Sequence, residues 1–194
     1  MSSQHKKIGL DFDDVIIDFC PALISEHNKE YGTSYEMKDM LHFEFEKLWG
    51  GTQKDTVDRI VKMYDAPPRI NFSPVAGVVE ALEILKDKYQ FVVVTGRPDT
   101  SKNSVVMWLE KYIPGVFKEI YFTNQFHGEQ KYTKADFCKM YNIDLFVDDY
   151  LPTILDITGK NISTILFDKP WNQAELPHDV VRVRSWKEIV DYLK

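Results

Sequence analysis

Short apolar runs separated by longer amphipathic stretches make up the hydrophobic pattern of this chain. Such runs, when polar residues bound them, are typical of the buried strands of a parallel sheet. They occur at residues 8–10, 91–94, 120–122, 145–147, 163–167 and 180–183. Between most of them apolar residues recur at helical spacing. Strands that alternate with helices predict an α/β fold with a doubly wound parallel sheet.

Helix limits follow from capping residues and from prolines and glycines. The first helix is expected to end near Tyr31, and a later one to begin at Ser73 and to reach about Lys88. Ser185 and Glu188 have the spacing of a capping box ahead of a closing helix. Further helices are expected over residues 52–64, 99–112 and 133–141, and from residue 151 onward.

No strand pattern occurs between the first two predicted strands. Two stretches there, residues 35–49 and 52–64, are instead rich in apolar and aromatic side chains, and the second has helical spacing. We therefore interpret residues 17–71 as a small helical cap. It would be inserted into a Rossmann-type core made of residues 1–16 and 72–194.

Three carboxylates within four residues follow the first apolar run: Asp11, Asp13 and Asp14. Ligands of open parallel sheets bind just beyond the carboxyl ends of the strands, so a site is expected here. Residues two apart on a strand point the same way, which lets Asp11 and Asp13 address one centre. Such close acids repel one another unless a cation or hydrogen-bond donors neutralise them. An acidic turn after a strand is the alternative interpretation.

Polar residues occur at later strand and helix ends in the same way. Thr95-Gly96 follow the second apolar run, Lys134 begins a later helix, and Asp148-Asp149 follow the fourth run. Taken singly, these residues could be a turn, a solvated lysine and a helix cap. Together they offer carboxylates to a hard cation, and a hydroxyl, a backbone turn and a lysine to phosphate oxygens. A phosphate bound with Mg²⁺ would satisfy all of them.

Composition narrows the function classes without selecting one. The chain has 194 residues and a formal net charge of −6, which disfavours binding to polymeric nucleic acid. Cys20 and Cys138 cannot build a disulfide framework, so we expect buried thiols in a reducing compartment. No signal-like or membrane-spanning stretch is recognised. We therefore expect a cytoplasmic protein without a membrane partner, and leave a homodimer open.

Two acid-rich α/β families combine carboxylates, a threonine and a lysine around magnesium. Receiver domains of two-component signalling carry their phosphoacceptor aspartate after a middle strand, whereas this chain has its DxD after the first strand, which excludes them. The order found here resembles the haloacid dehalogenase superfamily of phosphohydrolases, from residue 8 to about residue 170. A P-loop motif of the GxxxxGKS type is not recognised. The four motifs of the superfamily match Asp11-Phe12-Asp13-Asp14-Val15, Val94-Thr95-Gly96, Lys134 and Val147-Asp148-Asp149.

A narrower resemblance is to the 5'(3')-deoxyribonucleotidases, which carry a helical cap after the first motif. Residues 11–19 resemble their DxDGVLADF opening, and residues 166–172 (LFDKPWN) look like their characteristic segment near the end. Asp14 stands where the family has a glycine, and aspartate tolerates such a turn better than most residues. Arg97-Pro98 also departs from the mammalian-type members. Arg97 could bind phosphate or lie in a surface turn.

The superfamily resemblance implies a magnesium-dependent phosphatase. Asp11 would be the nucleophile that becomes an aspartyl-phosphate, and Asp13 would protonate the leaving alkoxide and later activate water. Thr95, Gly96 and Lys134 would hold the transferring oxygens. Mg²⁺ would be held by Asp11, Asp13 (through its carbonyl) and Asp148, and by Asp149 either directly or through water.

The nucleotidase resemblance implies nucleoside monophosphates as substrates, in particular 5'(3')-deoxyribonucleotides. Phe43, Phe45 and Trp49 of the expected cap could enclose a base, or could form the small core of the cap. Another small phosphorylated metabolite, or a 3'-phosphate on a nucleic-acid end, would suit the same chemistry. A non-catalytic nucleotide-binding module is disfavoured, because both Asp11 and Asp13 are present.

Overall fold

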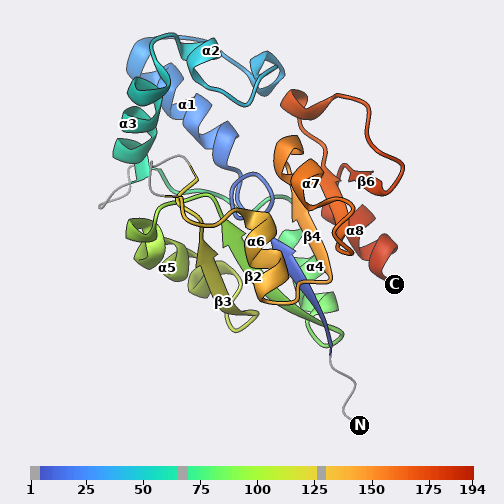
Figure 1. The fold of residues 1–194 in the computed structure, drawn as a ribbon. Helices are drawn as coiled ribbons and strands as arrows, with labels where there is room; N and C mark the ends of the chain where they lie inside the picture. The colour runs from blue at the N-terminus through green and yellow to red at the C-terminus, as the bar shows by residue number, and fades with distance from the viewer. Residues whose placement is uncertain (1–4, 65–69, 126–129) are drawn as a thin grey trace.

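A sheet of six parallel strands forms the centre of the computed structural model, which describes residues 5–64, 70–125 and 130–194 (Figure 1). The strands lie in the order β3-β2-β1-β4-β5-β6. The chain therefore starts in the middle of the sheet and winds outward in both directions, which confirms the predicted doubly wound fold. The strands are β1 (Lys6–Leu10), β2 (Tyr89–Thr95), β3 (Phe117–Phe122), β4 (Leu145–Asp148), β5 (Ser163–Phe167) and β6 (Val180–Val183).

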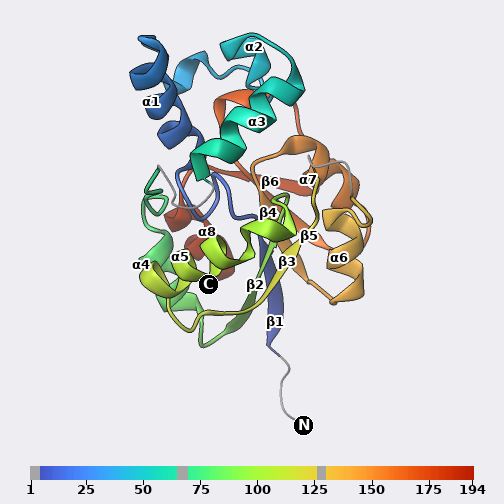
Figure 2. The ribbon, with the colours of Figure 1, turned by 90° about the vertical axis from the view of Figure 1, so that its left-hand side faces the viewer.

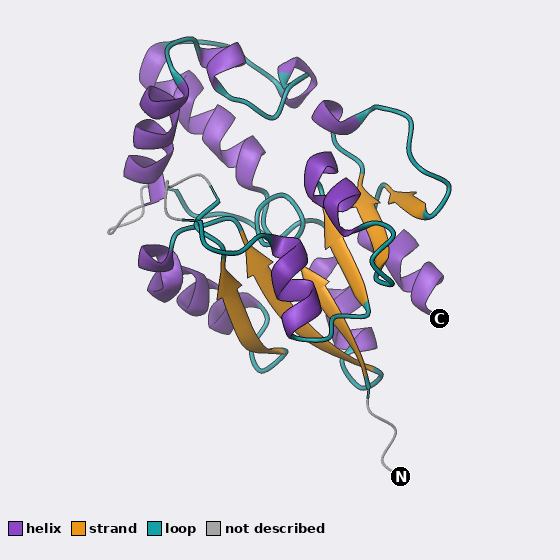
Figure 3. Cartoon of the chain, in the orientation of Figure 1, coloured by secondary structure: helices purple, strands orange, loops and turns teal. Residues whose placement is uncertain are grey.

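Helices cover both faces of this sheet, as Figures 2 and 3 show. On one face lie α4 (Val78–Leu85), α5 (Lys102–Tyr112) and α8 (Trp186–Leu193), and on the other lie α6 (Lys134–Met140) and α7 (Leu151–Ile157). Successive residues of β2 alternate between the two cores: Phe91 and Val93 pack on the first face, Val92 and Val94 on the second. Burial on both faces explains the uninterrupted apolar run.

One glycine is required by close packing within the sheet. A Cβ on Gly9 of β1 would lie 2.6 Å from the Phe146 ring and 3.0 Å from Ile143 Cδ1. Any side chain at residue 9 would therefore displace the rings and methyl groups packed there, of which Phe146 is fully buried in the second core.

A separate group of helices lies beyond the carboxyl edge of the sheet, on the opposite side from the N-terminus (Figure 1). These are α1 (Phe19–Tyr31), the 3₁₀ turn η1 (Met37–Asp39), α2 (Glu46–Trp49) and α3 (Gln53–Tyr64). No strand forms within residues 19–64, as predicted. Pro67-Pro68, which follow α3 in the sequence and would end a helix there, lie outside the described residues.

The chain leaves the core for these helices and returns to it at one place. Asp18 N donates to Ser73 O, and Val75 N donates to Ile16 O, each at 2.9 Å. This pairing corrects the expected start of the next helix at Ser73. Because the backbone around Ser73 pairs with the outgoing chain, α4 begins only at Val78, after Gly77 with its positive φ of 81°.

Some of the smaller predictions from the sequence are confirmed and others only in part. The predicted capping box at Ser185 forms only half, since Ser185 Oγ accepts from Glu188 N whereas the Glu188 carboxylate accepts from Arg184 N. Two further 3₁₀ turns, η2 (Asp99–Ser101) and η3 (Pro170–Asn172), precede α5 and follow β5. Cys20 and Cys138 are free and buried, as predicted. Within the described residues, no helix is both long and apolar enough to cross a membrane.

Candidate active site

The strand order brings the predicted acidic residues to one point at the carboxyl edge of the sheet. Asp11 follows β1, Thr95 ends β2 and Asp148 ends β4, and β1 lies between the other two strands. Asp11 N continues the ladder beyond β1 by donating to Val147 O at 2.9 Å. Residues far apart in the sequence therefore share one site because their strands are neighbours.

Three carboxylates form the centre of this site. Oxygens of Asp11, Asp148 and Asp149 all lie within 4.8 Å of one another. Their side chains are buried, with exposed fractions of 6%, 0% and 2%. Clustered carboxylate oxygens are the donors that hard cations such as Mg²⁺ prefer.

Lys134 supplies a positive charge inside the same cluster. Its Nζ lies 2.8 Å from Asp11 Oδ1 and 2.8 Å from Asp148 Oδ2, and the residue is only 5% exposed. A capping box places it, because Thr133 Oγ1 accepts from Asp136 N and the Asp136 carboxylate accepts from Thr133 N. The lysine is therefore fixed as the first residue of α6.

Burial dominates the electrostatics of these groups. It raises the pKa of Asp11 to about 8, and the charges of Asp148 and Asp13 add to this effect while Lys134 opposes it. It also raises the pKa of Asp149 well above the ordinary value, with Asp148 as the next cause. Burial alone would lower the pKa of Lys134, but Asp11 and Asp148 outweigh it and raise that pKa.

The charges of this cluster fit a bound divalent cation. Asp11, Asp148 and Asp149 face one lysine in a buried site, so in their ionised forms they carry more negative charge than Lys134 balances. A cation on the free carboxylate oxygens would compensate that charge and offset the burial that raises the pKa of Asp11 and Asp149. The donor set and the charge balance both suit Mg²⁺.

Asp14 turns the chain sharply after the first motif. Its φ is 56°, the left-handed conformation that the resemblance to a glycine-containing motif implied. Both carboxylate oxygens accept from Cys20 N at 3.1 Å, so the side chain ties the turn to the start of α1. Burial raises the pKa of Asp14 to about 6.

Asp13 is paired with Arg97, whose role the sequence left undecided. The Arg97 guanidinium binds the Asp13 carboxylate through two nitrogens, with Nη2–Oδ1 at 2.7 Å and Nε–Oδ2 at 2.9 Å. Arg97 is 6% exposed, so it does not lie in a surface turn. In the sequence, the position of Arg97 directly after Thr95-Gly96, at a predicted strand end, could have indicated that it belongs to the site.

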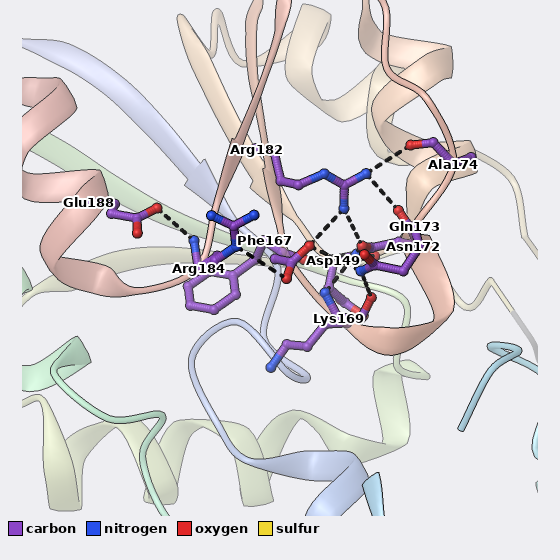
Figure 4. Close-up of polar contacts among 10 residues, drawn as sticks. Asp149, Phe167, Lys169, Asn172, Gln173, Ala174, Arg182, Arg184 and Glu188 are labelled. Atoms are coloured by element: carbon purple, nitrogen blue, oxygen red, sulfur yellow. Dashed lines mark hydrogen bonds and ion pairs between the residues drawn. The ribbon is translucent and has the colours of Figure 1, made fainter. Parts of the chain in front are cut away.

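The segment after β5 supports Asp149 through a hydrogen bond to its backbone (Figure 4). Asn172 Nδ2 donates to the carbonyl oxygens of Asp149 and Phe167, each at 2.8 Å. Arg182 in turn donates to Asn172 Oδ1 and Asn172 O at 2.8 Å and to Asp168 Oδ1 at 2.9 Å. The LFDKPWN segment, which the sequence singled out without a role, is therefore a rigid support for one carboxylate of the cluster.

A cavity of about 220 Å³ opens onto these residues. Its floor comes from the sheet edge and its far wall from the helices beyond it. The apolar wall includes Phe43, Phe45, Val57 and Ile60. Its other lining residues are Asp11, Asp13, Asp14, Phe19, Cys20, Glu44, Glu46, Gln53, Thr56, Gly96, Arg97, Gln125, Lys134, Asp149 and Tyr150.

Three predicted site residues do not line the cavity: Trp49, Thr95 and Asp148, the last of which is fully buried. Trp49 packs on the ring of His27 (centroids 4.6 Å apart, 12° between planes) and on Phe45 (4.5 Å), within the core of the helical group. Thr95 is fully buried beneath the cavity, and its Oγ1 accepts from Arg97 N at 3.2 Å. Phe43, Phe45 and Gly96 do line the cavity.

Sequence reasoning also missed Thr56 and Tyr150 as cavity residues. Thr56 is 3% exposed, and its hydroxyl has no hydrogen-bond partner among the described residues. Tyr150 follows Asp149 directly, and its ring lies 4.3 Å from that of Phe43. Tyr150 stands at a strand end, where a signal was available, whereas nothing in the helical pattern distinguishes Thr56.

The doubly wound sheet, the acidic strand ends and the inserted helices give this chain the fold of solved hydrolases of the haloacid dehalogenase superfamily. The fold is similar to that of a haloacid dehalogenase-like hydrolase, SP0104, from Streptococcus pneumoniae (TM-score 0.67, 17% identity, all of both chains covered). It is also similar to the magnesium-bound Bacillus subtilis protein titled "putative HAD-hydrolase YfnB" (TM-score 0.63, 15% identity, 98% of this chain and 99% of that one).

The chain belongs, more narrowly, to the family described as "5' nucleotidase, deoxy (Pyrimidine), cytosolic type C protein", whose model matches residues 5–194. A curated relative is the "Putative nucleotidase YqfW" of Bacillus subtilis (strain 168). It is 24% identical over 191 residues, which cover 96% of this chain and 93% of the relative. The protein is therefore a phosphoric monoester hydrolase of the nucleotidase type, as the sequence motifs predicted.

Proposed function

We propose that this protein is a magnesium-dependent phosphatase of nucleoside monophosphates, with 5'(3')-deoxyribonucleotides as the preferred class. The proposal rests on one observation: the same cavity has a charged part and an apolar part. A buried cluster of Asp11, Asp148, Asp149 and Lys134 meets an apolar cavity wall in one pocket of about 220 Å³. The first surface suits a phosphate and the second suits a base.

Asp11 is the nucleophile in this proposal. One carboxylate oxygen attacks phosphorus and forms an aspartyl-phosphate. Lys134 Nζ, 2.8 Å from Asp11 Oδ1, is placed to bind an oxygen of the transferring phosphoryl group, and Gly96 lines the same cavity. Thr95, buried beneath the cavity, supports this turn through its hydroxyl, which accepts from Arg97 N. Asp13 protonates the leaving oxygen and then takes a proton from the hydrolytic water.

Mg²⁺ would be held by the carboxylates of Asp11, Asp148 and Asp149 and by the carbonyl of Asp13. It would neutralise charge on the phosphate and so favour attack by an anionic carboxylate. The excess of buried negative charge around Lys134 supports this assignment.

We infer that residues 17–71 act as the substrate-selecting cap. The side-by-side connections at residues 16–18 and 73–75 support this division of the chain. Phe43 and Phe45 line the cavity, and with Val57 and Ile60 they offer an apolar surface on which a base can pack. Trp49, partly buried and packed on His27 and Phe45, belongs to the core of the cap in this proposal.

The test is phosphate release from a panel of nucleoside 5'- and 3'-monophosphates, deoxy and ribo, beside sugar phosphates and a DNA 3'-phosphate end, with and without Mg²⁺. Asp11→Asn, which removes the nucleophile with little change of shape, is the control, and its thermal unfolding checks that it folds. We expect metal-dependent turnover of deoxynucleotides that Asp11→Asn abolishes.

Other outcomes would redirect the assignment. Turnover of sugar phosphates alone, or of the nucleic-acid end alone, would keep the phosphatase chemistry and replace the substrate. Nucleotide binding without turnover would contradict the enzymatic proposal in favour of a binding module.

A cytoplasmic location, which the two free buried thiols support, is part of the same proposal.

A further inference from the structure

Arg97 and Asp13 form a partly buried ion pair that joins two neighbouring strand ends. Arg97 lies just after β2 and Asp13 just after β1. Asp13 Oδ1 accepts from Nη2 at 2.7 Å and from Nε at 3.2 Å, and Oδ2 accepts from Nε at 2.9 Å. Such a two-nitrogen contact fixes the plane of a carboxylate as well as its position.

Aromatic rings hold the guanidinium of Arg97 in place. Its Cζ lies 5.0 Å from the ring centroid of Phe12, 5.2 Å from that of Phe19 and 5.6 Å from that of Phe72. Phe12 belongs to the first motif, Phe19 begins α1, and Phe72 lies on the returning chain. Cation–π contacts with three separate segments make the arginine a rigid support.

The two ends of the pair differ in their access to the cavity. The Arg97 side chain is 6% exposed, whereas that of Asp13 is 22% exposed, and both residues line the cavity. The buried arginine thus presents a more accessible carboxylate beside Asp11. A general acid must lie within hydrogen-bond reach of the oxygen that it protonates, so fixing its rotamer matters for the rate.

We propose that Arg97 is a positioning residue, which holds Asp13 in the geometry that protonates the leaving oxygen of the substrate. The proposal rests on the proposed function, because it assigns Arg97 to the proton transfer of that reaction. Arg97 itself does not act on the reacting atoms. A phosphate-binding role would instead require it to give up Asp13.

The reaction has two displacement steps at phosphorus, with one proton transfer in each. A bond forms between an Asp11 oxygen and phosphorus, the bond from phosphorus to the leaving oxygen breaks, and that oxygen takes the proton of Asp13. Water then attacks the aspartyl-phosphate and gives a proton to Asp13, while the bond from phosphorus to Asp11 breaks. Inorganic phosphate and the free Asp11 carboxylate result. Only the first transfer depends on how poor the leaving group is.

Leaving-group dependence therefore separates positioning from a general structural role. Arg97→Lys keeps the charge but loses the two-nitrogen contact, and Arg97→Gln also loses the charge. We compare kcat/KM for a deoxynucleoside 5'-monophosphate, whose alkoxide needs a proton, with kcat/KM for p-nitrophenyl phosphate, whose phenolate does not. We expect Arg97→Lys to lower the nucleotide value about 100-fold, within the usual range for general acid catalysis. The p-nitrophenyl phosphate value should change by less than about 3-fold.

Two further variants complete the experiment. Arg59→Lys, an arginine of α3 that packs over the Tyr31 ring and does not line the cavity, is the matched control and should change neither value. Asp13→Asn should show the same leaving-group selectivity as Arg97→Lys. The double variant should have a nucleotide kcat/KM only slightly below that of Asp13→Asn alone, because both changes remove the same function.

Several results would overturn the assignment. Equal losses with both substrates would mean that Arg97 supports the fold or the whole site. A raised nucleotide KM at unchanged kcat would mean that Arg97 binds the phosphate. Thermal unfolding shows whether each variant is folded. If Arg97→Gln misfolds, the role of Arg97 is judged from Arg97→Lys, which is the smaller change. A wild-type protein that turns over neither substrate would contradict the proposed function and this assignment together.

Discussion

The indole Nε1 of Trp171 donates a hydrogen bond of 2.9 Å to Oδ2 of Asp149, across 22 residues of sequence. The backbone oxygen of the same aspartate accepts from Asn172. The indole therefore restrains the carboxylate of Asp149, while Asn172 restrains the backbone of the same residue. Contacts of this kind orient metal ligands in many proteins, and their loss weakens metal binding without removing a ligand.

Trp171→Phe should therefore weaken Mg²⁺ binding. The ring remains and only the donor is lost, so we expect an affinity about 10-fold lower, at the lower end of the usual range for supports of metal ligands. Isothermal titration of the metal-free protein with Mg²⁺ measures it directly. Trp108→Phe is the matched control, since it loses a 2.8 Å hydrogen bond to Phe72 O but no contact with a carboxylate of the cluster. Equal affinities of the two variants would refute a role for Trp171.

Lys134→Met should destabilise the metal-free protein strongly. It leaves Asp11 and Asp148 buried without their common cation, and removal of one partner of a buried pair costs about 3 to 5 kcal/mol. Urea unfolding in EDTA measures the loss, and Mg²⁺ should recover part of it because a cation again neutralises the acids. The control is Lys54→Met, which breaks an exposed pair with Asp58 and should leave stability nearly unchanged. Similar losses for both lysines would contradict the prediction.

Asp14 allows a test of the left-handed turn in the first motif. Asp14→Gly and Asp14→Ala both lose the hydrogen bonds to Cys20 N, but only alanine meets the steric penalty at a φ of 56°. Alanine should therefore be less stable than glycine by about 1 kcal/mol, although it normally gains from a less flexible unfolded chain. Denaturant unfolding in EDTA gives the difference. An alanine variant as stable as the glycine variant would mean that the turn relaxes.

Thr56→Val tests whether the unpartnered hydroxyl in the cavity wall serves the substrate. Valine has nearly the same shape, and the free protein loses no hydrogen bond, so stability should not fall. If the hydroxyl binds the nucleotide, KM should rise about 5-fold, the value of one ordinary hydrogen bond, at nearly constant kcat. Steady-state kinetics and thermal unfolding provide the two readouts.

Thr164→Val is the matched control for Thr56→Val. Thr164 is equally buried, but its hydroxyl pairs with that of Thr158 at 3.3 Å and it does not line the cavity. Its replacement should lower stability and leave KM unchanged. An unchanged KM in Thr56→Val as well would remove that hydroxyl from the binding site.

Periodicity and strand-end chemistry carried much of the prediction. Apolar runs marked the strands because a residue in the middle of this sheet, such as Val92 or Val93, is buried whichever face it meets. Lys134 could be placed at a helix start from local spacing alone. Local rules failed where distant chain segments compete for the same backbone groups, as at Ser73, whose carbonyl accepts from Asp18 instead of opening a helix.

The sequence by itself determined the parallel α/β core and the set of acidic and basic residues at its strand ends, because both depend on neighbours along the chain. Only the tertiary structure decided what the side chains contact. Aromatic spacing could not say that Phe43 lines the cavity while Trp49 stacks on His27. Nor could it pair Arg97 with Asp13, since that contact exists only because β1 and β2 lie side by side and end at the same edge.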